Sequence, residues 1–451
     1  MDKLVLLPLI ISALLLTTRS PREVFILSFL PAITFFPAYF NVKVVSGVPE
    51  LYFWSAALVP IIAVWATNGF DGYEPHWIDL FIFAYVFSIF FAQWSNSTYK
   101  ISQKILFNNL MGICVPYMMV RSFAADREAL VSLIRAITLV GAIVAFFNAI
   151  EFRMFVNHFD EHLRRLWPTY VVWDTGMVMS RWGFKRALGP FSHPIVAGYV
   201  FALIAPLALW CHNQGHYPSR RKGQLIVGLN ILGIFVSISR APIIGFLLGL
   251  AVIYYGWNKN RAAILTAVTT CGILLLMVIV PKFIDYIAVT RATATTEAQR
   301  NVAYRKEMWQ AYSEVVMERP YAGWGRFSVP SVKGMKSIDA EYLGVALASG
   351  IIVLSFYLVF LFGMLIRMIL YAQHTAHDDP WGRLAWCLIA GWVCAIFSQA
   401  TVYSGAQSVQ YLYMLGGVGQ ILILTRPRSL ASTVPAMVPV KTHRFGFARI
   451  L

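Results

Sequence analysis

Arg305 has the surroundings expected of an arginine that binds a buried anion. It lies with Trp309, Tyr312 and Val316 at the i, i+4, i+7 and i+11 spacing of one helix face. A solvated ion-pair arginine would lie on the opposite, polar face, so we expect Arg305 to point at something anionic and shielded from water. The alternative is an arginine whose stem lies along a membrane surface while its charge reaches water.

A second arginine, Arg186, lies just before a predicted helix that begins near Pro194. Free backbone N–H groups and the helix dipole favour anions at such an end, so Lys185 and Arg186 predict a phosphate-binding corner. The alternative is a basic pair that only anchors the helix at the membrane interface. We expect His193 either to cap this helix or to donate a hydrogen bond to the ligand.

A third arginine, Arg240, stands between two short apolar runs within Ser237–Leu250. An arginine at membrane depth costs roughly 2.5 to 3.5 kcal/mol on insertion scales and therefore usually has a partner. If the apolar segments simply alternate across the membrane, Arg186, Arg240 and Arg305 all fall on the same outer face. We therefore predict that these three arginines form one anion site.

Two carboxylates, Asp339 and Glu341, precede an apolar segment that starts at Tyr342. Carboxylates in the first turn of a helix are stabilised by the dipole, which also lowers their pKa. We expect Asp339 to cap the helix and Glu341 to be the better candidate for a general base, with Asp339 as the second candidate. Tyr342, Lys185 and His193 are predicted as further substrate contacts.

The composition defines the class of protein. Of the 451 residues, 58% are hydrophobic and 13% charged, which is typical of an all-α polytopic membrane protein rather than a soluble one. The net charge of +16 lies largely in loops between apolar segments, where Lys and Arg set orientation, so nucleic acid is not an expected partner. The five cysteines show no CxxC spacing, and the outer face carries no DxD pair. We therefore expect neither a disulfide framework nor a metal or other cofactor.

Hydropathy predicts about 12–13 transmembrane helices. Basic loops on alternate connections place the side that carries Arg220, Arg221 and Lys222 in the cytoplasm. Two long basic loops containing short helices then lie outside. The predicted regions are N-terminal membrane helices (1–150), a first long loop (151–190), central membrane helices (191–281), a large loop (282–341), C-terminal membrane helices (342–425) and a cytoplasmic tail (426–451).

The order of several motifs resembles the O-antigen ligase and polymerase family of bacterial envelope glycosyltransferases. These motifs are RALGPFSHPIVAGY, SISRAPIIG, YRKEMW, ERPYAGWG and SIDAEYLGVALASGI, within about 185–355. The resemblance implies a helical membrane fold of the GT-C type in the bacterial inner membrane, with the active site facing the periplasm. It also implies a donor glycan on undecaprenyl diphosphate, a glycan or lipid-linked acceptor, metal-independent catalysis, and other polysaccharide assembly proteins as partners. By motif, Arg240 and Arg305 correspond to the family's diphosphate contacts.

One motif departs from the family pattern. Where the ligases carry a histidine thought to activate the acceptor, this chain has Asp339-Ala340-Glu341-Tyr342. The acidic motif looks more like the polymerases of O-antigen or exopolysaccharide, which makes polymerisation of repeat units the expected function. Ligation of glycan to lipid A core is the first alternative. A transporter or flippase of lipid-linked glycans is the second, since it would also need buried cations.

Overall fold

The computed structural model describes residues 2–44, 49–166, 180–181, 183–270, 290–335 and 337–424. In these residues the chain is predominantly helical, and the strands form two short antiparallel pairs. The pairs are β1 (Asn41–Val42) with β2 (Leu51–Tyr52), and β3 (Ser180–Arg181) with β4 (Phe184–Lys185). The expected tail at 426–451 lies outside the described residues, as do residues 167–179 and 182 of the first long loop.

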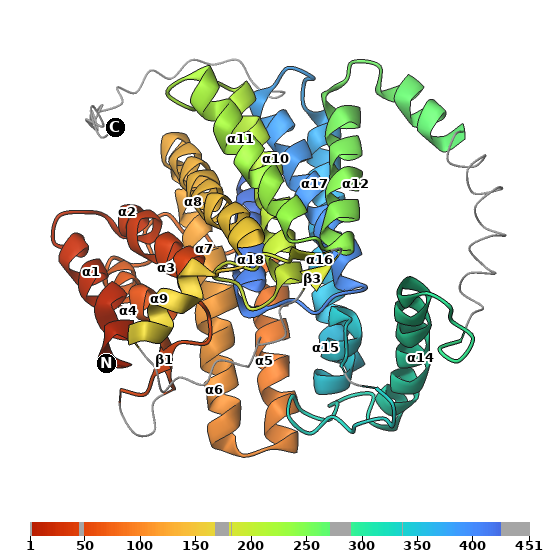
Figure 1. The fold of residues 1–451 in the computed structure, drawn as a ribbon. Helices are drawn as coiled ribbons and strands as arrows, with labels where there is room; N and C mark the ends of the chain where they lie inside the picture. The colour runs from red at the N-terminus through yellow and green to blue at the C-terminus, as the bar shows by residue number, and fades with distance from the viewer. Residues whose placement is uncertain are drawn as a thin grey trace.

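The helices follow one another without an intervening sheet layer (Figure 1). The helices of the N-terminal part are η1 (Asp2–Leu6), α1 (Leu7–Leu16), α2 (Pro21–Val24), η2 (Phe25–Phe29), α3 (Leu30–Phe35), α4 (Phe53–Thr67), α5 (Asp79–Asn96), α6 (Tyr99–Asn109), η3 (Leu110–Cys114), α7 (Val115–Arg121), η4 (Ser122–Ala125), α8 (Arg127–Met154) and α9 (His158–Leu166). The later helices are α10 (Pro194–Asn213), α11 (Arg220–Val236), α12 (Arg240–Trp257), α14 (Glu297–Glu318), α15 (Glu341–Ser349), α16 (Ile351–His374), α17 (Pro380–Gln399) and α18 (Ala406–Leu424).

The predicted class, an all-α polytopic membrane protein, is confirmed. Among the described helices, five are long and apolar enough to cross a membrane, namely α8, α10, α12, α16 and α17. Some other predicted spans are interrupted, α5 and α18 are long enough but less apolar than these five, and the predicted span at 262–281 extends beyond the described residues, so the expected count of 12–13 stays a prediction. The apolar segment 105–120, for example, is divided among α6, the π-helical turn η3 and α7.

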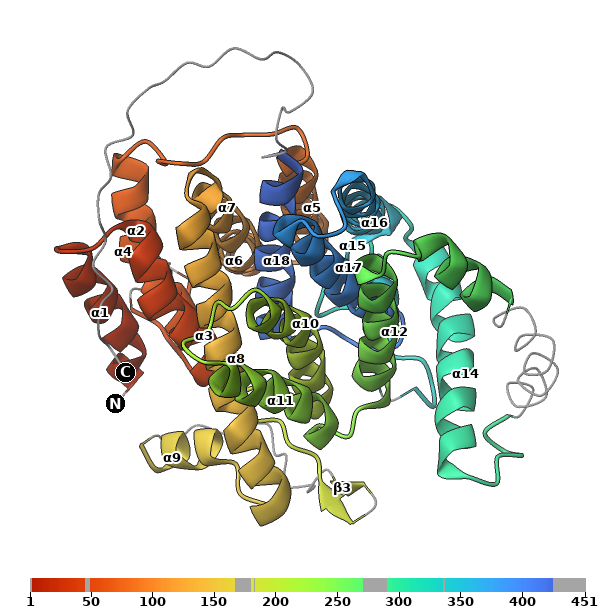
Figure 2. The same ribbon diagram turned by 90° about the horizontal axis from the view of Figure 1, so that it is seen from above.

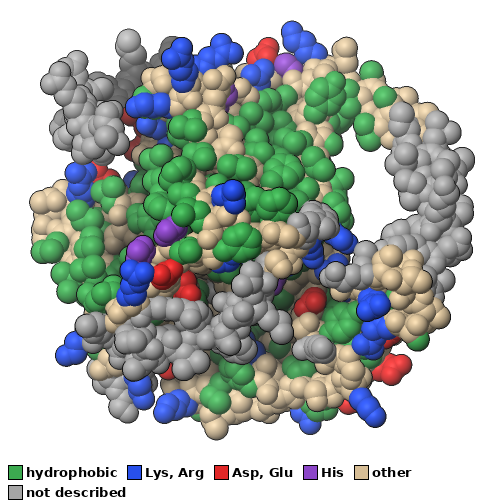
Figure 3. Space-filling view, viewed as in Figure 1, with side chains coloured by type: hydrophobic (Ala, Val, Ile, Leu, Met, Phe, Trp, Pro, Cys, Tyr) green, Lys and Arg blue, Asp and Glu red, His purple; other side chains and the backbone are tan. Residues whose placement is uncertain are grey.

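Helix α10 forms the centre of the bundle. Figure 2 shows it surrounded by α8, α11, α12, α17 and α18, and nearly all of its residues are buried. By contrast, α12 and α16 expose many large apolar side chains, as expected for helices that face lipid. Figure 3 shows a broad hydrophobic surface with Lys and Arg side chains along its upper rim.

Helix α12 packs against α17 along a row of glycines. A Cβ atom at Gly245 would come within 2.6 Å of the sulfur of Cys394, and one at Gly249 within 3.0 Å of the carbonyl oxygen of Ala390. Gly256 is similarly covered by the ring of Trp386. Small residues let membrane helices approach closely, so this row holds α12 at one height against α17.

One end of the bundle, here called the Arg220 end, gathers the connections after α10, α12 and α16. Trp210 Nε1 donates to the carbonyl oxygen of Pro380 at 2.8 Å, and Trp257 Nε1 donates to that of Arg383 at 3.2 Å. Helix α11, which begins at Arg220, starts at this end.

The opposite end, called the Arg240 end, gathers the connections before α10, α12, α15 and α18. The Arg186 guanidinium donates to the carbonyl oxygen of Ser237 at 3.2 Å, three residues before Arg240 in the chain. The backbone N–H of Ser404 donates to the Glu341 carboxylate at 2.7 Å. Figure 1 shows α14 and α15 beyond this end of α12 and α16.

We expect the two ends to face opposite sides of the membrane. Single cysteines placed near residues 221 and 310 should be labelled from opposite sides, with 221 accessible only from the cytoplasm, because Arg220, Arg221 and Lys222 begin α11 together. The measurement is labelling by a membrane-impermeant maleimide in intact and in permeabilised cells. Labelling of both positions from one side would contradict the arrangement.

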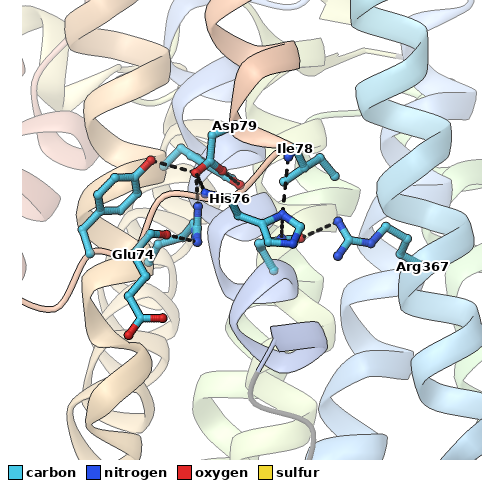
Figure 4. Close-up of polar contacts among 9 residues, drawn as sticks. Glu74, His76, Ile78, Asp79 and Arg367 are labelled. Carbon is cyan, nitrogen blue, oxygen red and sulfur yellow. Dashed lines mark hydrogen bonds and ion pairs between the residues drawn. The ribbon is translucent and has the colours of Figure 1, made fainter.

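A buried ionic cluster lies within the N-terminal helices (Figure 4). The Asp79 carboxylate accepts hydrogen bonds from Tyr117 and Tyr73, both at 2.8 Å, from the backbone N–H of His76 at 2.8 Å, and from the Arg121 guanidinium. The side chains of Asp79 and Arg121 are only 6% and 4% exposed. The cluster therefore ties α5 to α7 through a pair that is withdrawn from water.

A relay of hydrogen bonds extends from this cluster to the C-terminal helices. Gln420 of α18 contacts the His76 ring at 3.2 Å, and Arg367 of α16 donates to Gln420 at 3.1 Å. Figure 4 shows His76 between Asp79 and Arg367. The N-terminal helices are thus connected to α16 and α18 by polar contacts as well as by apolar packing.

Candidate functional site

Arg186 is held in place by the segment that precedes α10. Ala187 N–H donates to the carbonyl oxygen of Val236 at 3.0 Å, while the Glu151 carboxylate accepts from the N–H groups of Leu188 at 3.2 Å and Gly189 at 2.8 Å. These contacts bind the segment to α8 on one side and to α11 on the other. Arg186 is therefore presented to the turn between α11 and α12.

The Arg186 side chain supports that turn directly. Its Nε donates to the carbonyl oxygen of Ser237 at 3.2 Å, and its Nη2 donates to Ser239 Oγ at 2.9 Å. Burial, together with the nearby charge of Arg181, lowers the pKa of Arg186 to about 10, so it stays a cation at neutral pH. Lys185, by contrast, lies 3.3 Å from the Glu151 carboxylate and donates to the carbonyl oxygen of Phe155. Its charge is thus engaged inside the fold.

Arg240 is the first residue of α12 and is exposed. Ile238, two residues before it, has a positive φ of 44°, which turns the chain sharply between the two helices. Ser239 at the N-cap makes no side-chain cap to the helix. Within the part of the chain that the structure describes, no hydrogen bond or ion pair engages the Arg240 guanidinium. A free cation and an uncapped helix start coincide here, which favours an anion.

His193 occupies the N-cap of α10, and the predicted cap is confirmed. Its Nδ1 accepts a hydrogen bond from the N–H of Ile195 at 3.1 Å, so in the neutral ring the proton is on Nε2. Burial and then the charge of Arg186 lower the pKa of His193 to about 4, against a smaller opposite effect of Asp339. His193 is therefore a neutral donor located near both Arg186 and Asp339.

The two carboxylates occupy different surroundings from those expected. The N-cap of α15 is Ala340, which has no side-chain cap, so the prediction that Asp339 caps this helix is wrong. Asp339 is half-buried, its backbone N–H donates to Met308 Sδ at 3.4 Å, and no hydrogen bond or ion pair among the described residues engages its carboxylate. Because Asp339 does not cap α15, its carboxylate remains available, and its charge acts on His193.

Glu341 is the first residue of α15, as expected, and its contacts are with the 400–405 connection. Its N–H donates to the carbonyl oxygen of Val402 at 3.2 Å, and its carboxylate accepts from the Ser404 N–H at 2.7 Å. Burial raises its pKa from 4.5 to about 7, although the Ser404 hydrogen bond and the Arg326 charge oppose the rise. The predicted lowering of this pKa by the helix dipole is therefore wrong, because desolvation outweighs it.

The raised pKa of Glu341 predicts a pH dependence of stability. A carboxyl group whose pKa is higher in the folded than in the unfolded chain stabilises the fold below its unfolded pKa, and this stabilisation is lost as pH rises through about 7. Glu341→Gln should therefore flatten the decrease in melting temperature between pH 5 and pH 8. Thermal unfolding in detergent across that range provides the measurement, with Glu318→Gln on α14 as the control. An unchanged pH profile in Glu341→Gln would contradict the assignment.

Helix α14 brings Arg305 to the edge of the same region. Its buried face contains Met308, Tyr312 and Val316, which pack against Ala340 of the carboxylate segment. The predicted stripe is thus only partly correct, since Trp309 is 39% exposed and Arg305 is half-buried. Arg305 is one turn before Met308, and no hydrogen bond or ion pair among the described residues engages its guanidinium.

Tyr342 has a structural contact. Its hydroxyl donates to the carbonyl oxygen of Ile396 at 2.9 Å, which ties α15 to α17.

Two charged residues at the Arg240 end were not predicted from the sequence, Glu151 and Arg326. A carboxylate at the end of a membrane helix is costly, and that signal could have identified Glu151. Within the described ranges, no three His, Cys, Asp or Glu side chains are grouped as a metal site would need.

Comparison with known proteins finds a family match in the part of the chain that supplies most of these residues. Residues 225–358 match the family model described as O-antigen ligase, a range that contains α11, α12, α14 and α15 and therefore Arg240, Arg305, Asp339 and Glu341. The search of curated proteins gave no match. The resemblance to the O-antigen ligase family is thus confirmed over residues 225–358, the segment that supplies most of the candidate site.

Proposed function

We propose that the protein is a glycosyltransferase of the bacterial inner membrane that polymerises polysaccharide repeat units on its periplasmic face. The observation that carries this proposal is the meeting of cations and a free carboxylate at the Arg240 end. Arg186, Arg240, His193 and Asp339 come from three segments far apart in the sequence. The family match supports a glycosyltransferase type of enzyme.

The donor in this proposal is a glycan linked to undecaprenyl diphosphate. The hydroxyl oxygen of the acceptor attacks the anomeric carbon of the donor sugar, and the bond from that carbon to the phosphate oxygen breaks. The electron pair leaves with undecaprenyl diphosphate, while the proton of the hydroxyl passes to a base. Arginine guanidinium groups stabilise the departing diphosphate through paired hydrogen bonds, in the way that a metal ion would otherwise do.

Asp339 is the base that we propose. The charge of its carboxylate acts on His193, and so does the charge of Arg186. Glu341, in contrast, is buried and bound to the backbone of Ser404. The sequence had favoured Glu341 for this role; the surroundings of the two side chains lead us to propose Asp339 instead.

The arginines provide the first test of this site. Arg240→Lys and Arg305→Lys keep the charge but lose the planar fork, and a lost hydrogen bond to a charged group costs about 1.5–3 kcal/mol, or roughly 10- to 150-fold in product formation. The matched control is Arg300→Lys, since Arg300 is an exposed residue on the same helix as Arg305. If both site variants are expressed normally and form nearly as much product as the wild type, the arginines do not bind the diphosphate and only anchor the chain at the membrane surface.

The product identifies the type of transferase. Purified protein is incubated with a lipid-linked repeat unit, with and without lipid A core. A ladder of longer lipid-linked glycans is the expected result. Transfer only to lipid A core would mean a ligase, the alternative that the description of the matched family favours. Absence of both products would contradict the proposed enzyme.

A further inference from the structure

The loop after α14 contains a tight glycine turn that was part of the ERPYAGWG motif. Gly323 and Gly325 have positive φ values of 61° and 77°. A Cβ atom at Gly323 would come within 2.6 Å of the Ala348 carbonyl carbon, and one at Gly325 within 2.9 Å of Asn96 Cβ. The turn is therefore wedged between the end of α15 and the end of α5, where only glycine fits.

Hydrogen bonds fix the turn further. The N–H groups of Trp324 and Gly325 donate to the carbonyl oxygens of Leu347 at 2.8 Å and Ala348 at 2.9 Å. The Trp324 ring nitrogen donates to the carbonyl oxygen of Val315 at 3.0 Å. A surface loop held by this many contacts has one conformation, so the residue that follows it has a defined position.

That residue is Arg326. Its N–H donates to Oε1 of Gln93, a buried side chain of α5, at 2.8 Å, and its Nη2 donates to the Tyr403 hydroxyl at 3.2 Å. The Arg326 charge also acts on Glu341 and on Tyr52, so the guanidinium lies where α5, α15, β2 and the 400–405 connection meet. No carboxylate among the described residues lies within ion-pair distance of it.

Arg326 and Tyr403 together provide donors for a phosphate. The guanidinium keeps most of its five N–H donors free after its contact with Tyr403. Because the Tyr403 oxygen accepts that hydrogen bond, its own O–H remains available to donate. Tyr403 is 48% exposed, so both groups can be reached from outside the protein. An anchored guanidinium beside a phenol suits a phosphate oxygen pair better than a mobile surface arginine does.

We propose that Arg326 and Tyr403 form a second phosphate-binding subsite, which holds the diphosphate of a second lipid-linked glycan. This inference rests on the proposed polymerase, because joining two lipid-linked units requires two diphosphates to be bound at once. The charges of Arg186 and Asp339 both act on His193, whereas the charge of Arg326 acts on Glu341. The segment Asp339–Glu341 thus connects the donor subsite to the subsite for the acceptor, whose sugar hydroxyl must reach Asp339.

The test counts bound lipids. Native mass spectrometry of the full chain in detergent with undecaprenyl diphosphate should show two molecules on the wild-type protein. Arg326→Gln should leave one, and Arg240→Gln should leave the other. Lys333→Gln, an exposed cation on the same loop, should still bind two. If Arg326→Gln does not fold, Tyr403→Phe tests the second subsite instead. It should lower the affinity for the second lipid by about 10-fold, because it removes one hydrogen bond to a charged group.

Each outcome separates this inference from the proposed function. A single lipid that is lost in Arg240→Gln but kept in Arg326→Gln would overturn the second subsite and leave the glycosyltransferase standing. Two lipids in Arg326→Gln would overturn it as well. Displacement of the second lipid by an equal concentration of phosphatidylglycerol would make it a site for ordinary headgroups and overturn the acceptor role. No bound diphosphate lipid on the wild-type protein would contradict both proposals.

Discussion

Asp339→Asn is expected to lower the chemical step by roughly 10²- to 10⁴-fold, the usual contribution of a general base. Asparagine keeps the size of the side chain but cannot take the proton of the acceptor hydroxyl. Donor binding should persist, because in our proposal it depends on the arginines and on the start of α12. The measurement is single-turnover product formation at saturating donor, together with the affinity for undecaprenyl diphosphate.

Glu341→Gln is the matched control for this prediction. Glutamine can still accept the Ser404 hydrogen bond through its amide oxygen, so the contact between α15 and the 400–405 connection should remain. Turnover in this variant should stay close to that of the wild type. The reverse pattern, with full turnover in Asp339→Asn and a large loss in Glu341→Gln, would assign the base to Glu341.

Arg121→Ala is expected to destabilise the protein by about 3–5 kcal/mol, because it leaves the buried Asp79 charge without its cation. The three remaining donors, Tyr73, Tyr117 and the His76 N–H, reduce this penalty but do not neutralise the charge. The cluster joins α5 to α7 and is connected through His76 to Gln420 of α18 and Arg367 of α16, so its loss should loosen the N-terminal part. Melting temperature in detergent and the amount of protein in the membrane provide the measurement.

An exposed ion pair serves as the control for Arg121→Ala. Arg165 and Glu161 pair at 2.7 Å on α9, with side chains that are 70% and 43% exposed. Arg165→Ala should change stability by less than about 1 kcal/mol. A double variant, Asp79→Asn with Arg121→Met, should recover part of the loss, since it removes both charges. Equal melting temperatures for Arg121→Ala and the wild type would show that the pair is not essential.

The sequence was most informative about features that depend on local composition. Hydropathy predicted the all-α membrane class, and the order of five motifs predicted the family that now matches residues 225–358. The capping role of His193 was also within reach, because a cap involves only the next few residues. Each of these properties depends on neighbours in the chain.

The surroundings of the carboxylates could not be predicted in this way. Glu341 has a raised pKa because it is buried where α15 meets the 400–405 connection, some sixty residues later, and burial outweighs the opposing hydrogen bond from Ser404. Lys185 is engaged by Glu151 from the end of α8, and Arg326 is located by Gln93 of α5. A helical-face pattern likewise placed Arg305 on the apolar stripe, whereas the packing of α14 on α15 puts it at the edge. Packing between segments far apart in the sequence decides which charged side chains lie together, and a single sequence does not reveal that packing.

The glycine row between α12 and α17 has a consequence for the lipid environment. Because Gly245 and Gly249 leave no room for α12 to slide along α17, Arg240 at the start of α12 stays at one depth relative to the bundle. A thicker or thinner bilayer can adapt by bending its own leaflets around the protein, at a fraction of a kcal/mol per ångström. In the enzyme that we propose, the lipid-linked substrate, anchored by its tail, must then rise or sink to meet Arg240. Turnover would thereby become sensitive to the acyl-chain length of the surrounding membrane, without any residue of the site being altered.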